Sequence, residues 1–104
     1  MFGRMLVADC PPEELDRAGM ARFIEEEVIP RVEGEGGFRG VWFCLDPASG
    51  KLFSITLYET EADLLAAQEG IKELRGRALG KLGCTPVSAE SLEVIASSVP
   101  RESM

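Results

Sequence analysis

Three hydroxyl groups recur at every second residue near the middle of the chain. Ser54, Thr56 and Tyr58 alternate with apolar residues, which is the period of a β-strand, so their side chains should share one face. A tyrosine hydroxyl can donate a hydrogen bond to a substrate oxygen, and serine or threonine hydroxyls can orient a polar group beside it. We therefore take Tyr58 as a candidate catalytic residue, and Ser54 and Thr56 as candidate substrate-binding residues.

Two aromatic rings precede these hydroxyls in the chain. Trp42 and Phe38 could stack on an aromatic ring of a ligand. Rings beside small and hydroxylated residues suit a cavity with a few polar groups better than they suit a close-packed core. Trp42 and Phe38 are therefore candidate substrate-binding residues. The alternative is that both rings belong to the core and that the Tyr58 hydroxyl bonds a backbone carbonyl.

A predicted β-hairpin positions these side chains. Its strands, Phe38–Leu45 and Leu52–Glu59, are rich in β-branched and aromatic residues. Between them, Pro47 presets its own φ angle, and Gly50 can adopt the left-handed conformation that closes a turn. We expect a five-residue loop, 46–50.

This loop length fixes the pairing of the hairpin, because the side-chain period of a strand is two residues. Trp42 should lie opposite Ser54, and Phe38 opposite Tyr58, on a face beneath the helices. The other face should be smooth and apolar, with Val41, Phe43, Leu45, Phe53, Ile55 and Leu57. Apolar patches of that size seldom stay exposed on a monomer, so we expect a second copy of the chain to cover this face in a homodimer.

The remaining segments complete the element order β-α-β-β-α-β. We predict a strand at Arg4–Asp9, a helix that begins at Pro11-Pro12-Glu13-Glu14 and ends or kinks at Pro30, a second helix after Thr60–Asp63 that is broken by Gly70, Gly76 and Gly80, and a last strand within Val87–Ala96. This order predicts an α+β, ferredoxin-like fold, in which two helices cover one face of a four-stranded antiparallel sheet. We expect residues 1–104 to form a single domain.

Composition argues against several classes of protein. The net charge of −7 disfavours a nucleic-acid surface. The chain has no histidine, which removes histidine bases and histidine ligands of metal or haem. Cys10, Cys44 and Cys84 are odd in number and widely spaced, which predicts neither a disulfide framework nor a zinc site, and Cys44 should be a small buried hydrophobe. No apolar run is long enough to span a membrane and no signal peptide is recognisable, so we expect a cytoplasmic protein.

The chain resembles the dimeric α+β barrel superfamily, and within it the antibiotic biosynthesis monooxygenase-like proteins. The resemblance is carried by Gly37-Phe38-Arg39-Gly40, by the turn Asp46-Pro47 to Gly50, and by the run from Ser54 to Glu61. It implies that two protomers pack sheet to sheet, and that each holds a ligand cavity between its sheet and its helices. Tyr58 stands where the family often has a tryptophan.

The resemblance also implies an activity. Some relatives oxidise polyphenolic anthrone-type substrates with O₂ and no cofactor, which suggests a cofactor-independent monooxygenase that acts on a small aromatic or polyketide-like compound. Others degrade haem with a histidine ligand from the second helix, and this chain has no histidine. We expect no cofactor and no metal. The alternative is a non-catalytic barrel dimer that binds a small molecule or has a structural role.

The same element order also occurs in ACT-type regulatory domains and in RNA-binding modules. An ACT domain favours a glycine-bearing loop after the first strand, where this chain has Cys10-Pro11-Pro12-Glu13. An RNA-binding module needs basic residues around its exposed aromatic rings, and Arg39 is alone there. Both classes are therefore disfavoured.

Overall fold

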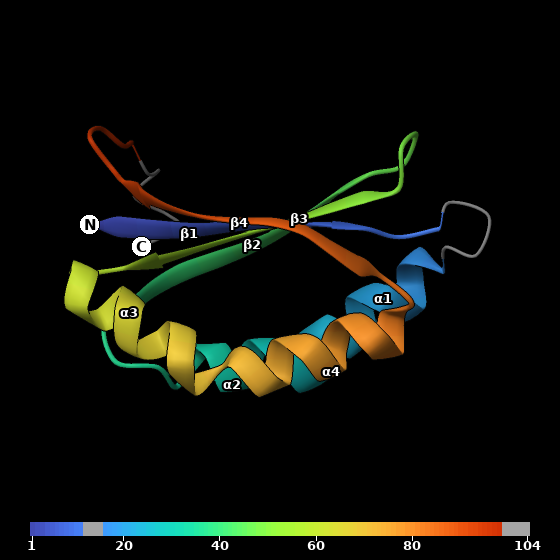
Figure 1. The fold of residues 1–104 in the computed structure, drawn as a ribbon, viewed down its shortest axis with the longest axis horizontal. Coiled ribbons are helices and arrows are strands. Elements are labelled where there is room, and N and C mark those ends of the chain that lie inside the picture. Colours follow the sequence, from blue (N-terminus) through green and yellow to red (C-terminus); the bar gives the residue numbers. More distant parts are fainter. Residues whose placement is uncertain (12–15, 99–104) are drawn as a thin grey trace.

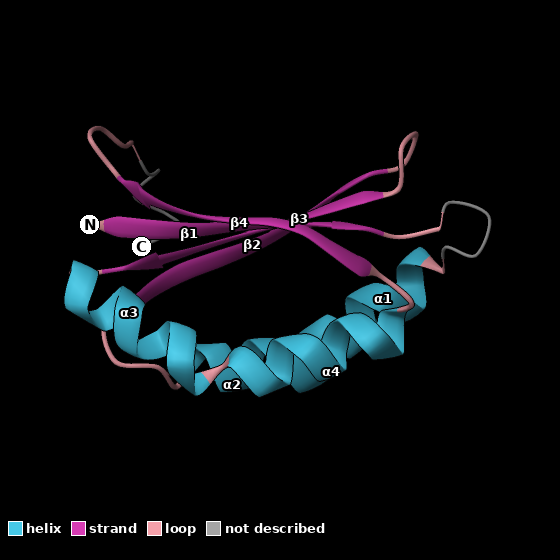
Figure 2. Ribbon diagram, viewed as in Figure 1, coloured by secondary structure: helices cyan, strands magenta, loops and turns pink. Residues whose placement is uncertain are grey.

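The structure is a computed structural model that describes residues 1–11 and 16–98. A four-stranded antiparallel sheet has the strand order β2-β3-β1-β4, and all helices lie against one of its faces (Figures 1 and 2). The predicted ferredoxin-like fold is confirmed. The elements are β1 (Phe2–Asp9), α1 (Arg17–Phe23), the π-helical segment η2 (Ile24–Val28), α2 (Ile29–Glu33), β2 (Phe38–Asp46), β3 (Lys51–Tyr58), α3 (Glu61–Gly70), α4 (Lys72–Leu82) and β4 (Thr85–Glu93).

The first helical arm consists of α1, η2 and α2. The Asp16 side chain caps α1 by accepting a hydrogen bond of 3.1 Å from the Gly19 backbone N–H. Before Pro30 the helix widens into a π-turn, where the Ile29 N–H donates to the Ile24 carbonyl five residues earlier. Proline has no N–H and crowds the preceding turn, and the wider turn accommodates it without ending the arm. The predicted start at residues 11–14 lies largely outside the described residues.

The second helical arm is broken at the first of its three glycines, whereas Gly76 and Gly80, which were also expected to break it, lie within the continuous helix α4. Thr60 caps α3, because its Oγ1 accepts a 3.1 Å hydrogen bond from the Asp63 N–H. The helix breaks at Ile71, directly after Gly70, and α4 then continues to Gly83, which has a φ of 70°. A positive φ at this position is the usual way for glycine to end a helix. The break lets α4 follow the curved underside of the sheet (Figure 1).

The hairpin loop is one residue shorter than expected, and the predicted pairing is wrong. Asp46 pairs with Lys51, so the loop is 47–50. The Asp46 carbonyl accepts a 2.8 Å hydrogen bond from the Gly50 N–H, and its carboxylate accepts one of 3.0 Å from the Ala48 N–H. These bonds hold Asp46 in the strand pair next to the turn, so it is the last residue of β2 rather than part of the loop. Gly50 has the expected positive φ, 77°.

This shift exchanges the two faces of β2 but not those of β3. Phe43 pairs with Ser54 beneath the helices, and Trp42 pairs with Ile55 on the opposite face. A bulge at Arg39 then restores the expected pair of Phe38 with Tyr58. We call the uncovered side of the sheet the bare face and define it by Met5, Trp42, Cys44, Phe53, Ile55 and Leu57.

Three residues of the expected smooth face, Val41, Phe43 and Leu45, are therefore misplaced. All three lie under the helices, where they line a hollow together with residues of the first arm. Trp42 takes their place on the bare face, with its ring over Gly40, where an added Cβ would lie 3.1 Å from the indole. Cys44 is exposed there rather than buried.

Cys10 and Cys84 form a disulfide, which the odd cysteine count did not predict. Both are buried, and the bond joins the end of β1 to the start of β4 across 74 residues. Asp9 and Thr85, their neighbours in the chain, are paired in the sheet, so strand pairing brings the two thiols together. Asp9, at the end of β1, does not cap the first helix, because Asp16 does so. Its carboxylate instead accepts a 3.1 Å hydrogen bond from the Lys51 ammonium.

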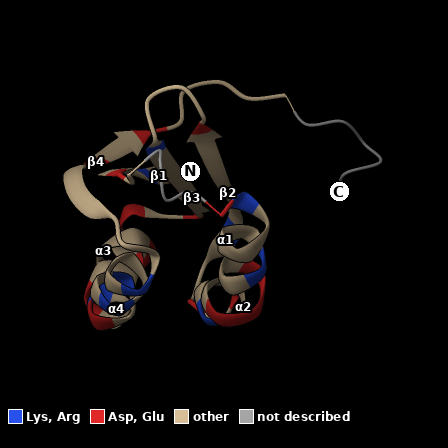
Figure 3. Cartoon of the chain, turned by 90° about the vertical axis from the view of Figure 1, so that its right-hand side faces the viewer, with Lys and Arg blue, Asp and Glu red and all other residues tan. Residues whose placement is uncertain are grey.

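The last strand, β4, begins and ends earlier than the predicted Val87–Ala96 and forms an exposed sheet edge. Charged residues gather mainly on the helices (Figure 3). Among the described residues, no helix is long and apolar enough to cross a bilayer.

Candidate functional site

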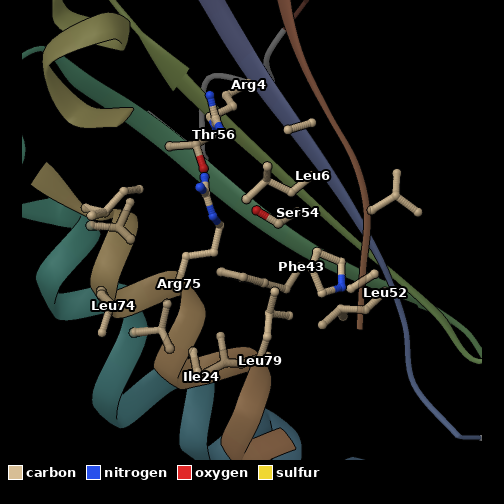
Figure 4. A pocket seen from close by; sticks show the side chains of 18 of the residues that line it. Arg4, Leu6, Ile24, Phe43, Leu52, Ser54, Thr56, Leu74, Arg75 and Leu79 are labelled. Atoms are coloured by element: carbon tan, nitrogen blue, oxygen red, sulfur yellow. The ribbon is translucent and has the colours of Figure 1, made fainter. Parts of the chain in front are cut away.

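A cavity of about 320 Å³ lies between the sheet and the two helical arms (Figure 4). Most of its wall is apolar. Leu6 and Phe43 line it from the sheet, Ile24 and Val28 from the first arm, and Leu74 and Leu79 from α4. Its polar lining consists of Arg4, Ser54, Thr56, Tyr58, Arg75 and Ser88.

Strand β3 brings three of the predicted site residues together. Ser54, Thr56 and Tyr58 all line the cavity, because the two-residue period of β3 points them beneath the helices. Phe38 packs instead on the hydrophobic cluster under the first arm and does not line the cavity. Trp42 is 51% exposed and lies on the bare face, so it is remote from the hydroxyl groups.

Tyr58 is fully buried, yet its hydroxyl has no hydrogen-bond partner among the described residues. The backbone carbonyl bond considered from the sequence is therefore not formed. Burial raises the pKa of the Tyr58 hydroxyl, the negative charge of Glu35 raises it further, and the positive charge of Arg4 lowers it. The hydroxyl is thus protonated at neutral pH, and its proton is not committed to an acceptor among the described residues.

The ionisation of Tyr58 can be measured directly, since it is the only tyrosine in the chain. We expect tyrosinate absorbance in the folded protein to appear with a midpoint above the ordinary value of about 10. The folded state holds this proton more tightly than the unfolded state does. The contribution of Tyr58 to the free energy of unfolding should therefore be fully present below about pH 10 and be lost as the pH rises through the raised pKa. Glu35→Gln should lower the midpoint, and a native midpoint at or below the unfolded one would contradict this environment.

Two arginines complete the polar part of the cavity, and sequence reasoning missed both. Arg4 comes from β1 and Arg75 from α4, and Arg75 reaches from its helix toward Thr56 and the sheet (Figure 4). The Nε atom of Arg4 and the Nη1 atom of Arg75 are buried without a hydrogen-bond partner among the described residues. Burial lowers the pKa of Arg4, the positive charge of Arg75 lowers it further, and Tyr58 acts in the opposite direction.

This set of groups can bind and orient a ligand, but it offers little acid–base chemistry. Within the described part of the chain, no aspartate or glutamate lines the cavity. Nor do the described residues contain a group of three cysteine, aspartate or glutamate side chains that could hold a metal ion. The available groups are hydrogen-bond donors, namely hydroxyls and guanidiniums, in an apolar enclosure. Such a site favours a substrate whose reactivity is largely its own.

No family model matches the chain, and no match was found among curated proteins. Solved structures do match. A monooxygenase from the ActVA-Orf6 gene of Streptomyces coelicolor, in complex with nanaomycin D, is 14% identical with a TM-score of 0.70, covering 95% of this chain and 91% of that chain. A proposed antibiotic biosynthesis monooxygenase from Deinococcus radiodurans is 14% identical with a TM-score of 0.67, covering 96% and 97%.

A third similar structure is described as a dimeric ferredoxin-like protein, from an uncultured marine organism. It is 12% identical with a TM-score of 0.63, and the match covers 96% of this chain and 100% of that chain. At these identities the likeness concerns the fold. The chain has a ferredoxin-like fold, which it shares with these three structures.

Proposed function

We propose that the protein is a cofactor-independent monooxygenase that oxidises a small, electron-rich aromatic compound in this cavity. The observation that carries the proposal is a cavity of about 320 Å³, lined by the hydroxyl of Tyr58, which has no hydrogen-bond partner among the described residues. Cavities of a few hundred cubic ångströms with apolar walls and few polar groups are typical ligand sites. The solved monooxygenase structures with the same fold support this choice of reaction.

The proposed reaction converts a substrate methylene group and O₂ into a carbonyl group and water. The methylene carbon loses two hydrogens and gains one oxygen atom, while the second oxygen atom leaves as water, so no external reductant is needed. The substrate first loses a proton to solvent water to give an oxygen-centred anion conjugated to that carbon, and this proton is recovered in the water that is released. Tyr58 donates a hydrogen bond to this oxygen, which lowers the energy of the anion as its charge develops. The apolar wall excludes water from the intermediates.

The test is O₂ consumption with dithranol, an anthrone, as the probe. Tyr58→Phe removes one hydroxyl and should lower turnover by about tenfold or more, the usual effect of removing a hydrogen bond to a developing charge. The matched control is Trp42→Phe, which alters a ring on the bare face and should leave turnover unchanged. An unchanged rate in Tyr58→Phe would remove Tyr58 from the site, and no O₂ consumption by the wild type would contradict the oxygenase.

A second candidate is a small-molecule binder without turnover. It is favoured by the absence of an aspartate or glutamate from the described lining of the cavity. A ligand that binds in the cavity and is recovered unchanged under O₂ would support this function. The open cavity argues against a purely structural role, because a scaffold would fill the space with side chains.

We further propose that two copies of the chain pack through their bare faces. Phe53, Ile55 and Leu57, three of the residues first assigned to the interface, lie on this face. Trp42 and Met5 extend it on the neighbouring strands. An apolar sheet face of this kind needs a cover, and a second copy provides it by two-fold symmetry. The dimeric neighbour with the same fold supports this occupant.

A further inference from the structure

Two guanidinium groups face the same cavity without a counter-ion. Arg4 approaches from β1 and Arg75 from α4, on opposite sides of the space beside Thr56 (Figure 4). The ion pairs among the described residues are Arg39 with Glu59 and Lys51 with Asp9, and neither involves these two arginines. Among the described residues, no ion pair therefore neutralises the positive charge of either arginine.

This arrangement of two like charges is unfavourable by itself. A partly buried charge without a partner loses hydration and gains nothing in return. The two like charges also disfavour each other, which is one reason why the pKa of Arg4 is lowered, after burial itself. An anion between them would supply acceptors for the buried Arg4 Nε and Arg75 Nη1 atoms, which lack partners.

We infer that the natural ligand is an apolar acid, and that Arg4 and Arg75 together bind its anionic group. The inference rests on the proposed function of the cavity as a ligand site and narrows the class of ligand. A guanidinium presents parallel N–H groups that match a carboxylate or an ionised phenol. The rest of the ligand would lie against the apolar wall, which includes Leu6, Phe43 and Leu74.

The geometry separates two roles within the site. Arg4 and Arg75 are binding residues for a permanent charge, whereas the Tyr58 hydroxyl faces the oxygen at which charge develops during the reaction. A free inorganic anion would satisfy the arginines but leave the apolar wall unused. The observations therefore favour an acid with a ring or chain attached over phosphate or sulfate alone.

The experiment is a calorimetric comparison of 2-naphthoate with 2-naphthamide, which have the same ring and nearly the same shape but differ in charge. We expect the acid to bind about tenfold more tightly or better, since charge-assisted hydrogen bonds exceed neutral ones by this amount. Arg75→Met should remove this advantage by weakening binding of the acid, while the affinity for the amide stays the same. Inorganic sulfate should bind at least tenfold more weakly than the acid.

Controls keep the result interpretable. Arg77→Met changes an exposed arginine of the same helix that does not line the cavity, and it should leave both affinities unchanged. Arg4→Met should weaken binding of the acid in the same way as Arg75→Met. If Arg4→Met prevents folding of β1, Arg75→Gln serves as the second variant, with a polar side chain in place of methionine. Thermal melting verifies that each variant is folded.

The outcomes are distinct. Equal binding of acid and amide would overturn the inference and leave the proposed ligand site intact. Binding of neither compound would overturn both. Tight sulfate binding would show a site for inorganic anions and overturn the assignment to an apolar acid. Acid-selective binding that is lost in Arg75→Met and kept in Arg77→Met would support the inference, whether or not dithranol is oxidised.

Discussion

Replacing Cys10 and Cys84 together by alanine is expected to lower the free energy of unfolding by about 4 kcal/mol. The disulfide closes a long loop, since the two cysteines are 74 positions apart in the sequence, and such a cross-link restricts the unfolded chain most. Alanine is preferred to serine because both positions are buried. The measurement is urea unfolding at one fixed protein concentration, because dimerisation would also contribute to stability.

The matched control is Cys44→Ala, since Cys44 is an exposed free thiol. It should change the free energy of unfolding by less than about 0.5 kcal/mol. Adding dithiothreitol to the wild type should reproduce the effect of the double variant. Thiol titration of the oxidised, denatured protein should find Cys44 alone, and three reactive thiols there would show that the disulfide is not formed.

Replacing Ile55 by aspartate should convert the proposed dimer into a monomer. Ile55 lies on the central strand β3 and faces away from the helices, between Met5 and Trp42 on the flanking strands. A carboxylate there would be solvated in the monomer but buried without a partner in the dimer. This should weaken association by about a hundredfold or more. Light scattering after gel filtration, across micromolar concentrations, measures the change.

Leu65→Asp is the comparison, because Leu65 is an exposed leucine on α3 and lies off the bare face. The same change of side chain should leave the oligomeric state as it is in the wild type. A monomeric wild type at all concentrations, or an Ile55→Asp protein that remains dimeric, would show that the bare face is not the interface.

The sequence was sufficient to predict the order of elements and the orientation of β3. Its alternation of Ser54, Thr56 and Tyr58 with large apolar residues leaves one consistent arrangement. Strand β2 is different, because Val41 and Phe43 on one side and Trp42 on the other are all apolar. Such a strand does not reveal its own register, and hydrogen bonds of the turn decide it. The predicted face of β2 was therefore wrong.

The arginines and the disulfide depend on contacts between distant parts of the chain. Nothing near Arg4 or Arg75 in the sequence marks either as a cavity residue, because their proximity results from packing α4 against β1. The disulfide could have been found. Cys10 directly follows β1 and Cys84 directly precedes β4, and these strands are neighbours and antiparallel in a ferredoxin-like sheet. The odd number of cysteines does not indicate this pair, whereas their positions on the expected topology do.

The position of Trp42 provides an intrinsic fluorescence signal for association of two protomers. It is the chain's only tryptophan, and its indole lies on the bare face rather than in the cavity. Emission from this ring should shift to shorter wavelength when a second protomer excludes water from it, and should respond little to occupancy of the cavity. Fluorescence on dilution therefore separates assembly from ligand binding without any added dye.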